Sequence, residues 1–488
     1  MNMESPELLF ESRLNIAAPG GISAMEGKLR FVQGKPKLHA EPVLVGDTYA
    51  DGAGVAIYGT VLRDGGRYRM WYQAGPKDWD GKDVALVGYA ESGDGIEWKK
   101  PHLGIFAYGP TPNNLTNLGF HCPSVFIDPD APPDHRYRAT GYASKGTKGA
   151  PEGLTSNGYY TAHSADGLRW ELDSFEPTWR SGDVITSVYH SGQRSGLVAL
   201  KYGPRYHGIP RRAVWNAELV DGKWSESWRA LVPDDFDDIG AMTRGFSSGD
   251  YYGMAMQPAG MGTVGFIWQF RHTLPRSAWQ KECWEDGVFG ATGVTLAYQE
   301  HARDCWQQAP GRTDFLACDC LPQSDGGIYT ASSPVECGDE HRLYLCRARR
   351  SHGWFLDNAW KTQERWVKMM LEEGGAQITF AHWPKWRLFG FKSDPEGKLT
   401  LDIGPLKHPS RLVLNYECEP QGSIRAELIG HESRTVNHAQ TLTGQSLAEC
   451  VAWKDGDILT PAPDGGSVLV KLHMELSTVW AYEVQAML

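Results

Sequence analysis

The 488-residue sequence contains no run of about 18 apolar residues, so we expect no membrane-spanning helix. It also lacks a basic excess, because 48 Lys and Arg stand against 59 Asp and Glu, for a net charge of −11. Nucleic acid and anionic membrane surfaces require a dense cationic face, so we expect neither as a partner. Residues 1–7 lack the basic and apolar parts of a signal peptide, which predicts a cytoplasmic protein, with a processed secreted chain as the alternative.

Cysteine is scarce and irregularly spaced. The nine cysteines are an odd number scattered along the chain, unlike the framework of a disulfide-stapled domain. Cys318 and Cys320 lack a second nearby pair, so we expect buried thiols there rather than a zinc site. The sequence therefore favours a reduced protein that requires no cofactor.

Glycine, proline and aromatic residues are abundant instead. There are 56 Gly and 29 Pro, together with 19 Trp, 20 Tyr and 16 Phe. Many tight turns between short, aromatic-rich strands produce this composition. A helical bundle or a doubly wound sheet would need long helices rich in Ala, Leu, Glu and Lys, so we expect an all-β chain.

A phrase of the form Ser-x-Asp-Gly-x-x-Trp recurs along the chain. Its clear copies occupy residues 92–98 and 164–170, each preceded by an aromatic strand and a strand of small residues. Weaker copies end at Trp224, Trp306 and Trp354. Each interval can hold four antiparallel strands, and five such units predict a five-bladed β-propeller. The Asp residues are then turn residues and the Trp residues core, rather than catalytic groups.

Beyond residue 355 the repeat stops. Alternating segments separated by Gly, Pro and Asp predict a β-sandwich there, at 386–391, 398–401, 411–416, 423–428 and 467–472. The expected domains are a propeller over 1–355 that includes an N-terminal strand segment over 1–45, a linker with a short helix over 356–375, and a sandwich over 376–488.

Five short segments carry a family resemblance, at 9–14, 35–44, 120–126, 250–254 and 327–332. With the order of propeller and sandwich, they resemble the glycoside hydrolases of families 32, 43 and 68, and most of all a family-32-like group of bacterial proteins. The resemblance implies that an oligosaccharide or glycoside binds in the propeller funnel. Three carboxylates from different blades would act there as nucleophile or base, transition-state stabiliser and general acid.

Three positions differ from the family pattern. The family phrase Phe-Arg-Asp-Pro-x-Val-Phe corresponds to residues 120–126, which places Cys122 where the stabilising Asp is expected. The same alignment places Tyr58 in blade 1 and Ile185 in blade 3. None of the three is acidic, so the acid and the base must come from elsewhere. Cys122 could be a thiolate nucleophile beside His121, but a small buried residue is the favoured interpretation.

Polar residues just before the first strand of each blade are expected to converge on the funnel mouth. These are Asp51, His121, Asp183, Asp250 and Asp325, in blades 1 to 5. Glycosidic cleavage needs an acid and a carboxylate about 5 Å or about 6.5–9.5 Å apart, and crowding keeps one of them protonated. We therefore predict Asp51, Asp183 and Asp250 as catalytic, with His121 as an alternative acid or an orienting donor.

Sugar binding needs flat rings with polar edges and groups that hold hydroxyls. The predicted substrate-binding residues are Tyr58, Trp71, Arg244, Tyr252, Trp268, Arg271, Asp325 and Tyr329. A divalent cation such as Ca²⁺ at the propeller axis is a further possibility, since carboxylates and tyrosines surround it. The sequence does not single out any residue as a metal ligand.

Three functions follow from these expectations. The favoured one is hydrolysis of a glycosidic bond by paired-carboxylate acid and base chemistry. A glycoside phosphorylase or transferase would need a cationic pocket, for which Arg244, Arg271 and Arg276 are candidates. A carbohydrate-binding propeller without catalysis is the third. Loops around residues 77–81 and 274–287 are candidate lids or dimer arms, and a homo-oligomer is possible.

Overall fold

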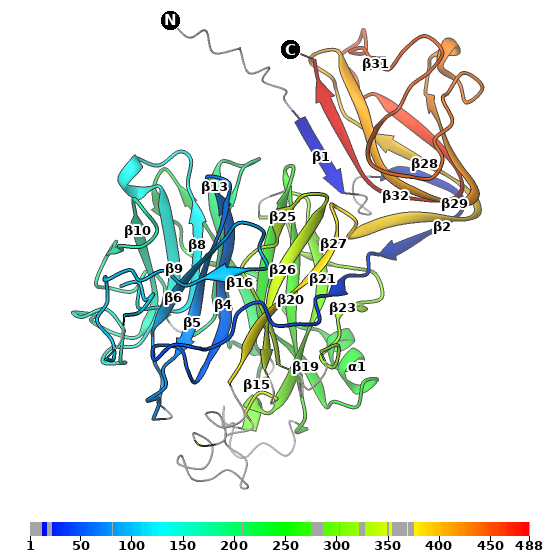
Figure 1. Cartoon of the computed structure of the whole chain (residues 1–488). Helices are drawn as coiled ribbons and strands as arrows, with labels where there is room; N and C mark the ends of the chain where they lie inside the picture. Colours follow the sequence, from blue (N-terminus) through cyan, green and yellow to red (C-terminus); the bar gives the residue numbers. More distant parts are fainter. Residues whose placement is uncertain are drawn as a thin grey trace, which may run out of the picture. The chain divides into compact units, whose positions relative to one another are not determined.

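The computed structural model describes residues 12–16, 22–80, 82–110, 112–180, 182–206, 208–275, 286–301, 303–321, 327–348, 351–353, 368 and 375–487. Nearly all regular structure in these residues is strand (Figure 1). The chain forms two compact units. A larger unit comprises residues 36–258 and 263–382, and a smaller one comprises 1–35, 259–262 and 383–488. No helix in the described part of the chain is long and apolar enough to cross a membrane.

The larger unit contains five successive antiparallel blades. Blade 1 consists of β4 (Gly54–Asp64), β5 (Arg67–Gly75), β6 (Val87–Ser92) and β7 (Trp98–Lys99). Blade 2 consists of β8 (His121–Ile127), β9 (Tyr137–Ala143), β10 (Gly158–Ser164) and β11 (Glu171–Leu172). Blade 3 consists of β12 (Ile185–His190), β13 (Ser195–Tyr202) and β16 (Ala213–Val220), with β17 (Lys223–Trp224) and β18 (Trp228–Leu231) outside. The short pair β14 (Arg205–Tyr206) and β15 (Ile209–Pro210) lies in its β13–β16 connection.

Blade 4 consists of β19 (Ser248–Ala259), β20 (Gly262–His272) and β21 (Gly290–Gln299), with β22 (Gln307–Gln308) and β23 (Asp314–Leu316) outside. Helix α1 (Asp235–Met242) precedes it, and its N-cap Asp234 accepts hydrogen bonds from two backbone N–H groups of the first turn. Blade 5 consists of β24 (Gly327–Thr330), β26 (Glu340–Ala348), β27 (Gln377–Pro384) and β3 (Lys37–Leu38), with β25 (Val335–Cys337) beside β26.

The five inner strands β4, β8, β12, β19 and β24 form a closed ring. Hydrogen bonds link each to the next: Val125 N to Thr60 Oγ1 (2.8 Å), Ser187 N to Ser124 Oγ (2.7 Å), Thr186 Oγ1 to the Met254 carbonyl, Met256 N to the Ser332 carbonyl (2.9 Å) and Ser332 N to the Gly59 carbonyl (2.9 Å). Because the last bond returns to β4, the predicted five-bladed propeller is confirmed.

The repeated turns have the predicted local role. Asp94 Oδ1 accepts hydrogen bonds from the N–H groups of Ile96 (2.8 Å) and Glu97 (2.9 Å). Asp166 does the same for its own turn, and the neighbouring blade holds that turn through Trp71 Nε1, which donates to the Gly167 carbonyl at 2.7 Å. These Asp side chains therefore shape turns that join adjacent blades.

The smaller unit is built on one antiparallel sheet with a single core. Its strand order is β2 (Ile22–Gln33), β28 (Phe389–Asp402), β32 (Leu469–Ala486), β29 (Ser410–Leu428) and β30 (Gln445–Cys450), with β1 (Ser12–Ile16) on β32 and β31 (Ile458–Leu459) on β29. Register shifts interrupt the long strands, two of them in β29. Leu414 and Ile424 lie on either side of these shifts yet share the core, so the bent strands form both layers of the predicted sandwich (Figure 1).

The domain limits differ from the sequence-based ones in two places. Strand β2 pairs with β28 and belongs to the smaller unit, although residues 1–45 were expected in the propeller. Strand β27 pairs with β3 and completes blade 5, although residues from 376 onward were expected in the sandwich. Both strands find partners far away in sequence, which local alternation cannot identify. Apart from Lys368 and Gly375, the predicted linker lies outside the described residues.

Candidate active site

All five blades contribute side chains to one group around the ring of Tyr252, here called the axial cluster. Its members are Tyr58 on β4, His121 on β8, Asp183 before β12, Lys201 on β13, Arg212 before β16, Tyr252 on β19, Tyr329 on β24 and His352. Tyr329 stacks on Tyr58 with ring centroids 4.8 Å apart and lies 5.3 Å from Tyr252. His121 lies 5.4 Å from Tyr58. The predicted residues Tyr58, His121, Asp183, Tyr252 and Tyr329 are thus brought together.

Asp183 is the half-buried carboxylate of the cluster. Its side chain is 44% exposed and forms an ion pair with Lys201 Nζ. Burial acts to raise the pKa of Asp183, but the Lys201 ammonium, helped by His121 and Arg212, holds that pKa below its usual value. Asp183 is therefore ionised near neutral pH, which suits a nucleophile or base and not a proton donor.

Lys201 lies at the end of a buried apolar strand. Its Nζ is 4.1 Å from the centroid of the Tyr252 ring, a cation–π contact. Burial lowers the pKa of Lys201, the charge of Asp183 raises it, and the nearby Arg212 guanidinium lowers it. The charge of each group therefore favours the charge of the other.

His121 lies at an irregularity of β8. The register with β9 shifts between His121 and Ser124, and Cys122 has φ 54°, a conformation rare outside glycine. Burial lowers the pKa of His121, while the charges of Asp183 and Asp83 raise it less strongly. A neutral imidazole is expected near pH 7, so His121 suits the role of an orienting donor better than that of the acid.

His352 holds Tyr252 in place. The Val288 carbonyl can only accept, so His352 Nδ1 carries the proton and donates to it at 2.5 Å. His352 Nε2 is then the acceptor for the Tyr252 hydroxyl at 2.9 Å. Burial, with the charges of Arg212 and Lys201, lowers the pKa of His352 to about 4, which agrees with a neutral ring.

Asp51 lies apart from the axial cluster, contrary to the prediction. Its fully buried carboxylate accepts hydrogen bonds from Thr48 N (2.8 Å), Thr48 Oγ1 (2.7 Å) and Tyr72 Oη (2.9 Å), and pairs with Lys100. Burial acts to raise the pKa of Asp51, and Lys100 lowers it below its usual value. Asp51 therefore fixes the turn before β4 and has no surface for a substrate.

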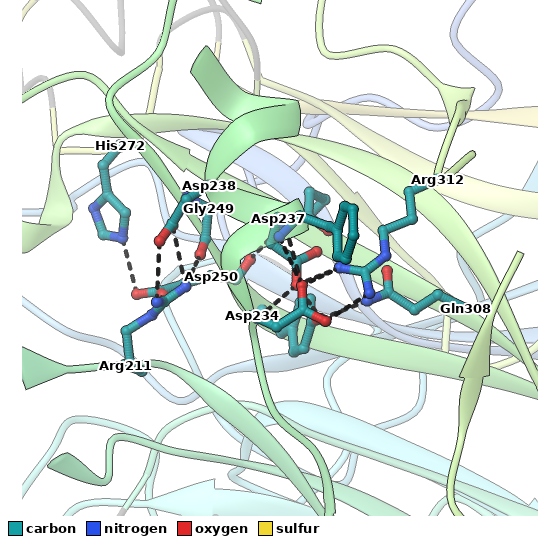
Figure 2. Close-up of polar contacts among 12 residues, drawn as sticks. Arg211, Asp234, Asp237, Asp238, Gly249, Asp250, His272, Gln308 and Arg312 are labelled. Carbon is teal, nitrogen blue, oxygen red and sulfur yellow. Dashed lines mark hydrogen bonds and ion pairs between the residues drawn. The ribbon is translucent and has the colours of Figure 1, made fainter. Parts of the chain in front are cut away.

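Asp250 is also enclosed. Its carboxylate is 1% exposed, accepts from Arg211 Nε at 2.7 Å and contacts His272 Nε2 at 2.9 Å. Arg211 also pairs with Asp238 of α1 at 3.1 Å, so Asp250 belongs to a buried ionic group (Figure 2). Of the three predicted catalytic carboxylates, Asp183 alone lies in the axial cluster.

Three predicted substrate-binding residues, Trp71, Arg244 and Arg271, lie elsewhere, and a fourth, Trp268, packs against the cluster. Trp71 is fully buried between blades 1 and 2. Trp268 is 1% exposed, donates from Nε1 to Thr330 Oγ1 at 3.0 Å, and makes edge-to-face contacts with the rings of Tyr58 and Tyr329. Arg244 and the buried Arg271 both pair with Asp314, beside a separate cavity of 640 Å³. Asp325 and Arg276 lie outside the described residues.

Two further expectations concern the axis, namely a thiolate at Cys122 and a divalent cation. Cys122 is 1% exposed, and burial holds its pKa well above the usual value, so it is a neutral thiol. Among the described residues, no three His, Cys, Asp or Glu side chains gather as metal ligands. Asp183, the one acidic member of the axial cluster, is paired with Lys201, and the divalent cation at the axis stays a prediction.

Sequence reasoning missed Lys201, Arg212 and His352. Lys201 follows the apolar residues 196–200, and Arg212 comes directly before the apolar residues 213–215. A charge at the end of a buried strand was the available signal for both. His352 had no comparable signal, because it meets Tyr252 from 100 residues away.

No family model matches the sequence, and neither does any curated protein. Several solved structures resemble it. A thermostable family-43 glycoside hydrolase has a TM-score of 0.41 at 12% identity, covering 71% of this chain and 93% of that chain. The family-32 β-fructofuranosidase of Bombyx mori has a TM-score of 0.41 at 12% identity, covering 93% of this chain and 94% of that one.

A third solved structure comes from the GH130 family of mannoside phosphorylases, which contains glycoside hydrolases that target β-1,2 mannosidic linkages in Candida mannan. It has a TM-score of 0.43 at 14% identity, covering 76% of this chain and 97% of that chain. Families 32 and 43, which the sequence resembles, thus recur among the solved structures. TM-scores of 0.41–0.43 do not transfer residue roles or substrates to this chain.

Proposed function

We propose that the protein is a glycoside hydrolase that cleaves an oligosaccharide or glycoside at the axial cluster, with Asp183 as its acting carboxylate. The observation that carries this proposal is the ionised, half-buried Asp183, which pairs with Lys201 where that lysine lies on the ring of Tyr252. Sugars bind through apolar faces on such rings and through hydroxyls on polar edges. An ionised carboxylate beside the bound sugar can attack the anomeric carbon or activate water.

The leaving group needs a proton from a second group. Asp83, an exposed residue whose charge acts on His121, is proposed as the group that would supply this proton from its protonated form. His121 would orient that carboxyl or the substrate. In this proposal Asp183 and Asp83 are the two carboxyl groups of the reaction, and Asp51 and Asp250 keep structural roles.

The test is the substitution Asp183→Asn, which keeps the size of the side chain and removes its charge. We expect kcat on a responsive glycoside to fall by about 10²–10⁴-fold while glycan binding remains. Asp221→Asn is the matched control, because Asp221 is an exposed hairpin residue of blade 3 with φ 51°, which Asn also adopts.

Two results would contradict the proposal. One is an Asp183→Asn variant with full turnover. The other is an unmodified protein that binds glycans from a broad panel without cleaving any of them, which would favour a carbohydrate-binding propeller.

A further inference from the structure

We propose that Lys201 and Arg212 form a binding site for an oxyanion, supplied either by a carboxylate on the sugar substrate or by inorganic phosphate. This inference deepens the proposed function and rests on it. The chemistry shared by both sources is a planar or tetrahedral group of charged oxygens, which arginine and lysine recognise.

Both cations lie against the same aromatic ring. Lys201 Nζ is 4.1 Å from the centroid of Tyr252, and the Arg212 guanidinium carbon is 5.9 Å from it. Arg212 also stacks on Phe270 at 4.7 Å. Two like charges held beside one ring repel each other, and this arrangement is stabilised when an anion lies between or above them.

Arg212 is positioned but not neutralised by the described residues. Its Nη1 donates to the Gly287 carbonyl at 2.8 Å, and its ring contacts fix the plane of the guanidinium. Among the described residues it forms no ion pair and no further hydrogen bond, although its charge acts on Asp183. A fork of N–H groups held in this way is suited to two parallel hydrogen bonds from a carboxylate or phosphate.

The charges of the axial cluster leave a positive balance. Asp183 supplies one negative charge against those of Lys201 and Arg212, and it is already paired with Lys201; Asp83, whose charge acts on His121, forms no ion pair with either cation among the described residues. His352 is neutral, because its Nδ1–H donates to the Val288 carbonyl and its Nε2 accepts from the Tyr252 hydroxyl. An anionic ligand group therefore complements the Arg212 side of Tyr252, and a wholly neutral sugar leaves that charge unmatched.

The experiment is calorimetric titration of the full chain with inorganic phosphate, glucuronate and glucose at constant ionic strength. We expect phosphate or glucuronate to bind and glucose to bind more weakly than glucuronate. Arg212→Gln and Lys201→Met should each weaken anion binding by about 10- to 100-fold. Arg229→Gln and Lys223→Met are matched controls, because both residues are exposed on the outer strands of the same blade.

The titrations distinguish the two sources of the oxyanion and can overturn the inference. Binding of phosphate assigns the site to a free co-substrate, and binding of glucuronate without phosphate assigns it to the sugar. The inference is overturned if neither anion binds, or if anion binding survives both substitutions. Melting curves verify that the variants fold, and Arg212→Lys, which keeps the charge, should retain more affinity than Arg212→Gln. Turnover is not measured, so a failure here leaves the Asp183→Asn test of the proposed function unaffected.

Discussion

At the scale of single residues, the environment of Asp183 differs from that of the other two candidate carboxylates in its access to solvent. Asp51 and Asp250 are buried and bound on all sides by donors, whereas Asp183 is 44% exposed and has a single cationic partner. Ionised groups that have a shifted pKa and still reach solvent are typical of functional sites. Asp183 is therefore the carboxylate on which the proposed chemistry depends, and Lys201 is the residue that keeps it ionised.

Removal of Lys201 should move the acid limb of the pH–activity profile. Burial raises the pKa of Asp183, and Lys201 is the main opposing influence, which holds the pKa below the usual 3.8. In Lys201→Met the effect of burial prevails, so the pKa of Asp183 rises and activity is lost at a higher pH. The measurement is kcat/KM against pH for both proteins, with Lys223→Met as the control.

An acid limb that stays in place, or moves to lower pH, would exclude Asp183 as the group that titrates. The unmodified protein should keep its activity until the pH falls through the depressed pKa, because the ionised form of Asp183 is the active one. A bell-shaped profile would report the second group as well, on the alkaline side.

At the scale of elements, the turns that join the blades depend on side-chain acceptors. Asp166 Oδ1 receives two backbone N–H groups at 2.8 Å each, and Trp71 of blade 1 binds the same turn. These hydrogen bonds are local, so the sequence phrase specifies them directly. The turns then hold the faces of neighbouring blades together and thereby position the inner strands.

Asp166→Ala should lower the free energy of unfolding by about 0.5–1.5 kcal/mol, because the N–H groups of Leu168 and Arg169 lose their shared acceptor. Asp166→Asn keeps an acceptor oxygen and should cost less. Chemical denaturation gives both values. The kcat of the folded protein should be unchanged in either variant, and a large fall in kcat at full stability would show that this Asp has a role beyond the turn.

At the scale of the whole molecule, the N-terminal part of the chain completes both units. Strand β3 pairs with β27 in blade 5, with Leu38 opposite Ala381, and β2 pairs with β28, with Phe31 opposite Phe391. Each of these strands is therefore an edge that covers a partner from the far end of the sequence. An uncovered edge strand exposes unpaired N–H and C=O groups and promotes aggregation.

Deletion of residues 1–44 should give a protein that is insoluble or that melts about 10 °C or more below the full chain, since β27 and β28 both lose a neighbour. Deletion of residues 1–11, which precede β1, removes none of these pairings and is the control. Scanning calorimetry and light scattering measure the effect. Equal melting temperatures for the two truncated chains would contradict the assigned strand pairing.

The sequence by itself determined the all-β class, the number of blades and the role of the repeated Asp residues. Those features depend on hydrogen bonds within a few residues, such as Asp94 to Ile96 N, and on alternation along single strands. The tertiary structure decided the candidate site. Asp51, Asp183 and Asp250 occupy similar positions in the sequence, but the direction and partners of each side chain depend on contacts from other loops and blades. Exposure and pKa arise from such non-local contacts, which explains why Lys201, Arg212 and His352 emerged only from the folded chain.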